Sequence, residues 1–110
     1  MKQNILIVED HELTRFGLKT TFEGVEYVEN IYEADSAEAD IEIFDNNKID
    51  LVIMDLGLPN MNGIEATKQI RSSNKDVKII ILTSHNDERE VLNSLKAGAN
   101  AYCSQFLRWH

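Results

Sequence analysis

The sequence predicts an α/β fold in which a doubly wound parallel sheet of five strands is covered by helices on both faces. Short runs rich in Val and Ile alternate with longer amphipathic stretches, and this alternation is typical of right-handed βαβ units. Three of the runs are almost entirely apolar, as expected for central parallel strands that are covered on both faces. With 110 residues, the chain is long enough for one small domain with a single core.

Five segments have the length and the β-branched composition of strands rather than of buried helix segments. In chain order, the predicted strands are residues 4–8, 27–33, 50–54, 77–83 and 101–104. The first, third and fourth are the apolar ones and should lie in the centre of the sheet. The second strand is not apolar throughout, and the character of its side chains alternates from one residue to the next. We therefore expect it at an edge of the sheet.

The four stretches between the strands are predicted helices, because each carries an apolar stripe at helical spacing. The predicted inward faces are Leu13, Phe16 or Gly17, and Thr20; Ala37, Ile41 and Phe44; Ile64, Thr67 and Ile70; and Val91, Leu92 and Leu95. Gly24 and Gly98 occupy positions where a glycine with positive φ ends a helix, and Asp35 with Glu38 imitates a capping box.

The segment after the fifth predicted strand is too short for a stable amphipathic helix. We therefore expect a domain over residues 1–105, followed by an atypical tail, 106–110, in place of a last helix. The tail carries three large apolar residues that should find a surface to cover. Two arrangements remain open: the tail folds back onto a bare sheet face, or it pairs two copies of the chain as a homodimer.

Composition excludes several classes of function. The formal net charge of −8 argues against a nucleic-acid-binding surface and against attraction to anionic lipid. Cys103 is the only cysteine, and no apolar run is long enough to span a bilayer. We therefore expect a protein of the reducing cytoplasm that makes no direct contact with nucleic acid or membrane.

Three carboxylates follow two of the apolar strands. Glu9 and Asp10 follow the first predicted strand, and Asp55 follows the third. Ligands of open α/β sheets bind outside the carboxyl ends of the strands, so these acids are expected in one site. Oxygen donors suit a hard divalent cation such as Mg²⁺, which also binds phosphate oxygens. The pattern favours a metal-assisted phosphoryl site over three unrelated surface acids.

Four motifs in order resemble the receiver domains of two-component response regulators, most closely the NarL-type receivers. The segments that carry the resemblance are Ile5 to His11, Met54 to Gly63, Ile81 to Ser84 and Lys96 to Tyr102. The resemblance implies a flavodoxin-like sheet with strand order 2-1-3-4-5. The short segment after the last strand indicates that the fifth helix of the family is missing or replaced here. The resemblance further implies a regulatory phosphoacceptor domain, rather than an enzyme acting on other substrates, with a sensor histidine kinase or a phosphotransfer protein as partner.

The resemblance also implies roles for individual residues. Asp55 would be the phosphoacceptor, and Mg²⁺ would be held by the side chains of Glu9, Asp10 and Asp55 and by the backbone carbonyl of Gly57. Thr83 would be the switch hydroxyl that binds a phosphoryl oxygen, and Tyr102 the switch aromatic. His11 and the other two histidines are too scattered in the sequence to suggest a metal site, and we interpret them as loop or surface residues.

The sequence departs from the family at position 105, where receivers carry a lysine and this chain has Gln105. Glutamine donates a hydrogen bond but brings no charge. An alternative is therefore a phosphorylation-impaired receiver that acts only as a protein-interaction module. An aspartyl phosphatase would need a second acid where Gly57 stands, and a flavin binder would need a hydroxyl-rich loop after the first strand, so both are disfavoured.

Overall fold

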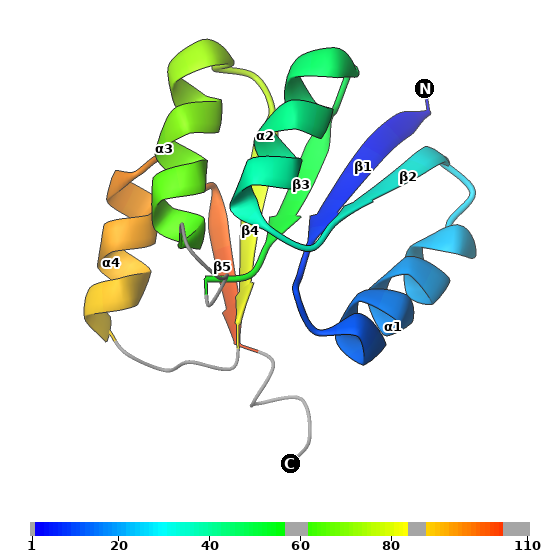
Figure 1. Ribbon diagram of the computed structural model, residues 1–110, viewed down its shortest axis with the longest axis horizontal. Coiled ribbons are helices and arrows are strands. Elements are labelled where there is room, and N and C mark those ends of the chain that lie inside the picture. The colour runs from blue at the N-terminus through cyan, green and yellow to red at the C-terminus, as the bar shows by residue number, and fades with distance from the viewer. Residues whose placement is uncertain (1, 57–61, 84–87, 105–110) are drawn as a thin grey trace.

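The computed structural model describes residues 2–56, 62–83 and 88–104, and it contains the predicted parallel sheet (Figure 1). The strands are β1 (Gln3–Val8), β2 (Val28–Ala34), β3 (Leu51–Met54), β4 (Lys78–Thr83) and β5 (Ala101–Ser104). Their order is β2-β1-β3-β4-β5, which places the apolar β1, β3 and β4 in the centre and β2 at an edge. The predicted strand order and the edge position of β2 are confirmed.

Four helices are described, and each connects two consecutive strands. They are α1 (Glu12–Glu23), α2 (Ala37–Asn46), α3 (Gly63–Ser73) and α4 (Glu88–Lys96). Figure 1 shows α2, α3 and α4 grouped on one side of the sheet and α1 apart from them. Within the described ranges, none of these helices is long and apolar enough to cross a membrane. The absence of a fifth helix stays a prediction, because residues 105–110 lie outside the described part of the chain.

Two apolar layers hold the sheet, one on each face. Alternate strand residues such as Leu6, Val8 and Met54 pack with α2 and α3. The intervening residues Ile5, Ile7, Ile53 and Leu82 form the second layer, against which Leu18 and Phe22 of α1 pack. Because side chains alternate along a strand, covering both faces requires nearly every residue of a central strand to be apolar.

The predicted inward face of α1 is wrong. Leu13 is 83% exposed and Phe16 is 64% exposed, whereas Leu18 and Phe22 face the sheet. Leu13 with Phe16 and Leu18 with Phe22 are two apolar pairs at different angles around the helix axis. Only one of the pairs can point toward the sheet. Periodicity within the helix does not distinguish the two, because tertiary contacts select which pair faces the sheet.

The inward faces of α2 and α4 are also shifted from the prediction. In α2, Asp40 is fully buried together with Ala37 and Phe44, while Ile41 is only partly buried. In α4, the buried residue is Ser94, and Leu92 is 55% exposed. Ser94 tolerates burial because its hydroxyl donates a hydrogen bond to the Val91 carbonyl within the same helix.

One of the predicted caps is confirmed, one has a different backbone conformation, and one is displaced by a residue. Gly98 follows α4 with a φ of +116°, as predicted. Gly24 follows α1 with a φ of −84°, which any residue can adopt. The N-cap of α2 is Ser36 rather than Asp35, and its hydroxyl accepts a hydrogen bond from the backbone N–H of Ala39.

Candidate functional site

Two buried acids are held at the carboxyl edge of the sheet by backbone hydrogen bonds. Val8 and Met54 are register partners on β1 and β3. One residue further on, the Asp55 N–H donates to the Val8 carbonyl at 3.0 Å, and the Glu9 N–H donates to the Ala34 carbonyl at 3.0 Å. Both acids therefore extend the ladder beyond the ends of the strands, and Glu9 is only 3% exposed and Asp55 8%.

Asp10 completes a compact acidic cluster with Glu9 and Asp55. One ligand atom from each of these residues and from His11 lies within 4.8 Å of the others. Asp10 Oδ1 is buried and accepts no hydrogen bond within the described ranges, although it lies 3.3 Å from His11 Nδ1. Buried carboxylates are costly unless a cation neutralises them. The convergence of oxygen donors and the unsatisfied oxygen of Asp10 therefore fit a hard divalent ion.

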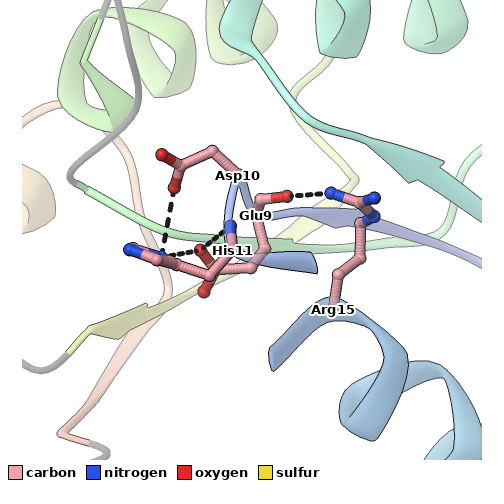
Figure 2. Close-up of polar contacts among 4 residues, drawn as sticks. All are labelled: Glu9, Asp10, His11 and Arg15. Carbon is pink, nitrogen blue, oxygen red and sulfur yellow. Dashed lines mark hydrogen bonds and ion pairs between the residues drawn. The ribbon is translucent and has the colours of Figure 1, made fainter. Parts of the chain in front are cut away.

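His11 belongs to this cluster, which the sequence analysis missed. Its Nδ1 lies 2.8 Å from Glu9 Oε2, and its backbone N–H donates to the same oxygen at 3.1 Å (Figure 2). The hydrogen bond to Glu9, followed by the negative charges of Asp10 and Glu9, raises the pKa of His11. The interpretation of His11 as a loop or surface residue agrees with its 71% exposed side chain, but it did not include the contacts with Glu9 and Asp10. Its position directly after two acids was the available signal.

Arg15 of α1 fixes the backbone of the loop that carries the acids. Its Nη1 donates to the Glu9 carbonyl at 2.8 Å, as Figure 2 shows. The same side chain lies 3.4 Å from Glu33 of β2, and Lys19 lies 3.3 Å from the second oxygen of Glu33. These contacts link β1, α1 and β2 around the site. Sequence reasoning assigned no such role to Arg15, because the contact depends on how α1 folds back.

Gly63 brings the start of α3 against the backbone of Asp55. The Gly63 N–H donates to the Leu56 carbonyl at 3.1 Å, and a Cβ at position 63 would overlap the carbonyl oxygen of Asp55. Asn62 caps the helix, with its side-chain oxygen accepting from the Glu65 N–H at 2.9 Å. The close approach of α3 to the site therefore requires a residue without a side chain.

The remaining predicted residues lie on the neighbouring strands or outside the described residues. Thr83 ends β4, and its side chain is outside the described part. Tyr102 pairs in register with Ile81, two residues before that end. It is partly buried, and burial, followed by the negative charge of Glu90 on α4, raises its pKa. Gly57 and Gln105 also lie outside the described residues.

A parallel sheet of this order with an acidic cluster at its carboxyl edge defines a class of signalling domain. Residues 5–105 match the response regulator receiver domain family. The chain therefore belongs to the receiver domains of two-component response regulators.

Individual relatives agree with this assignment. The response regulator UvrY of Escherichia coli K12 is 37% identical over 102 residues, which are 93% of this chain and 47% of UvrY. A LuxR-family response regulator from Aurantimonas sp. SI85-9A1 has a TM-score of 0.89 at 31% identity, over 96% of this chain and 75% of the other. CheY of Borrelia burgdorferi, solved with CheX, BeF3 and Mg²⁺, has a TM-score of 0.87 at 28% identity, over 94% and 78%. This chain spans about half the length of UvrY.

Proposed function

We propose that this chain is the phosphoacceptor domain of a two-component phosphorelay and that Asp55 is phosphorylated in an Mg²⁺-dependent reaction. The observation that carries the proposal is the convergence of Glu9, Asp10 and Asp55 at the end of β1 and β3. A carboxylate is a competent nucleophile toward phosphorus once charge repulsion is cancelled. The phosphoryl donor would be a phosphohistidine of a sensor histidine kinase or of a phosphotransfer protein.

Asp55 has two tasks in this proposal, and Glu9 and Asp10 have one. A carboxylate oxygen of Asp55 forms the new bond to phosphorus while the bond to the donor nitrogen breaks. Glu9, Asp10 and Asp55 would hold Mg²⁺, with the Gly57 carbonyl as a further ligand. The ion would supply positive charge that offsets the repulsion between carboxylate and phosphoryl oxygens. The hydrogen bond from Asp55 N–H to Val8 keeps the acceptor fixed on the sheet.

Thr83 and Tyr102 are the proposed switch residues. They belong to adjacent strands at the same edge of the sheet, and α4 packs beside β5. Thr83 would bind a phosphoryl oxygen after transfer, and the ring of Tyr102 would change its orientation in response. The domain would then act as a regulator that assists only its own phosphorylation and dephosphorylation.

Labelling with acetyl phosphate tests the acceptor. Intact-mass spectrometry in the presence of Mg²⁺ should show the addition of one phosphoryl group. The addition should be lost in Asp55→Asn and retained in Asp76→Asn, a matched change of an exposed aspartate elsewhere on the surface. A phosphoryl group that persists in Asp55→Asn would contradict the assignment.

The alternative function, a phosphorylation-impaired interaction module, depends on Gln105. Without the family lysine, transfer should be slow or should fail to switch the domain. Comparing Gln105→Lys with the parent chain by labelling rate, and by Trp109 fluorescence with beryllofluoride and Mg²⁺, decides between the two. Equal rates and equal fluorescence changes would remove the reason for this alternative.

Location and assembly are further parts of the proposal. A cytoplasmic location is supported by the single cysteine and by the need to meet a kinase. A homodimer through the face of β5 and the tail is supported by the exposure of Ala101 and Cys103 on this edge strand. The absence of direct nucleic-acid binding by this chain is supported by its net charge of −8.

A further inference from the structure

The side chain of His11 is directed into the acidic cluster although most of it is accessible to water. An exposed histidine can satisfy both ring nitrogens with water, yet Nδ1 lies 2.8 Å from Glu9 Oε2 and 3.3 Å from Asp10 Oδ1. Figure 2 shows the ring turned toward the two carboxylates. The orientation is supported by the backbone, because the His11 N–H also donates to Glu9 Oε2. Nδ1 is thus part of the wall of the candidate metal site.

The distances from His11 Nδ1 to Glu9 and to Asp10 are those of neighbouring donors around one cation. Neighbouring donors of a six-coordinate ion with bonds of about 2.1 Å are separated by about 3 Å. The distances from His11 Nδ1 to Glu9 and Asp10 bracket that value. One ligand atom of Asp55 also lies within 4.8 Å of all the others. The cluster therefore offers three oxygen donors and one nitrogen donor to a single position.

The nitrogen donor changes which ions the site favours. Mg²⁺ is bound by oxygen ligands, and imidazole suits ions such as Co²⁺, Ni²⁺ and Zn²⁺, whose affinities for nitrogen exceed that of Mg²⁺. We propose that His11 is a metal ligand through Nδ1 and that it shifts the selectivity of the acidic site from Mg²⁺ toward these transition-metal ions. This inference rests on the metal site of the proposed function and deepens it.

A different arrangement would give the same distances in the metal-free protein. His11 could act only as an ion-pair partner of Glu9 and Asp10, with Nδ1–H as donor, and rotate into solvent when an ion binds. The exposed side chain has room for that rotation. Experiments on the metal-loaded protein distinguish a ligand from a displaced partner.

The first experiment detects the bond itself. The full chain loaded with Mn²⁺ is studied by pulsed electron paramagnetic resonance, which reports ¹⁴N nuclei directly bonded to the ion. We expect the coupling of one imidazole nitrogen in the parent chain and in Glu12→Gln, and its loss in His11→Ala. Glu12 is the matched control because it is an exposed neighbour of His11 that lies outside the cluster. A parent chain that binds Mn²⁺ without this coupling overturns the inference.

The second experiment measures selectivity by calorimetric titration with Mg²⁺ and with Co²⁺ at one fixed, mildly alkaline pH. Loss of the nitrogen donor in His11→Ala should weaken Co²⁺ binding by about tenfold or more and change Mg²⁺ binding much less. Equal weakening for both ions, or none, overturns the inference. Normal labelling of Asp55 without nitrogen coupling refutes only the role of His11, whereas nitrogen coupling without labelling refutes only the phosphoacceptor. A chain that binds none of these ions refutes the whole metal site.

Discussion

Asp40 is an acidic residue that lies in an apolar environment. Its carboxyl group is fully buried, and neither oxygen has a hydrogen-bond partner within the described ranges. Ala37 and Phe44, one turn before and one turn after it on α2, belong to the apolar core. Burial, followed by the negative charge of Asp45, raises the pKa of Asp40 from 3.8 to about 7. The folded domain therefore holds this carboxyl in its neutral form more readily than the unfolded chain does.

This shift predicts that Asp40 makes folding less favourable as the pH rises. Because the folded pKa is the higher one, the folded state binds more protons between the two values, and stability falls from about pH 4 to pH 7. Above about pH 7 the loss of folding free energy that is due to Asp40 levels off at about 4 kcal/mol. Asp40→Asn should remove this pH dependence and should be the more stable protein at pH 8. Denaturant unfolding at several pH values measures both effects.

The matched control for Asp40 is Glu42→Gln, which removes an exposed acid from the same helix. Its unfolding curve should follow that of the parent chain at every pH, because an exposed carboxylate loses little on folding. If Asp40→Asn and the parent chain lose stability equally between pH 4 and 8, the carboxyl of Asp40 is not the titrating group.

A residue of the site could be predicted from the sequence when it directly follows an apolar strand, and not when its contacts depend on a turn. Glu9 and Asp55 follow apolar strands, and parallel strands that end together place such residues side by side. Their convergence could therefore be predicted. His11 and Arg15 could not, because their contacts with Glu9 depend on the turn between β1 and α1. Nothing in the pattern of that turn fixes its dihedral angles.

Among the described helices and strands, α3 begins in close contact with the backbone of the site. A methyl group at position 63 would meet the backbone of Asp55 and Leu56, which cannot yield as a flexible side chain does. Gly63→Ala should therefore destabilise the fold by about 1–3 kcal/mol. It should also displace Asp55, weaken metal binding and slow acetyl phosphate labelling. Denaturant unfolding and calorimetric titration with Mg²⁺ measure these effects.

Gly17→Ala is the matched control for Gly63→Ala. Gly17 lies within α1, and a Cβ there would have no atom within 4 Å. Alanine should stabilise that helix by about 0.5–1 kcal/mol and leave metal binding unchanged. Equal effects of the two substitutions would show that position 63 is governed by helix propensity rather than by its contact with Asp55.

Strands could be predicted more closely than helix orientations. The apolar content of β1, β3 and β4 follows directly from burial on both faces, and their predicted bounds agree with the structure to within one residue. A helix with two apolar pairs, such as α1, has more than one acceptable rotation. The rotation is selected by tertiary contacts, which the periodicity of one segment does not contain.

For the whole molecule, the proposed homodimer is open to a direct test. Ala101 and Cys103 are exposed on β5, the edge strand, which pairs only with β4 in the described sheet. We expect sedimentation equilibrium to show a dimer whose association weakens by about tenfold or more in Ala101→Lys, since a charge at the interface must lose its water. Glu42→Lys, at an exposed position of α2, should leave association unchanged. A monomer at every concentration would contradict the proposal.

The way α1 is attached has a consequence for how the domain opens. No residue of α1 is fully buried, and the helix is held by Leu18, Phe22 and the ionic contacts of Arg15 and Lys19. Segments with few buried contacts unfold locally before the rest of a domain. The amides of α1 should therefore exchange with deuterated water ahead of those of α3. Each local unfolding of α1 would separate Arg15 from the Glu9 carbonyl. The loop that carries the acids would then lose one of its contacts while the sheet stays folded.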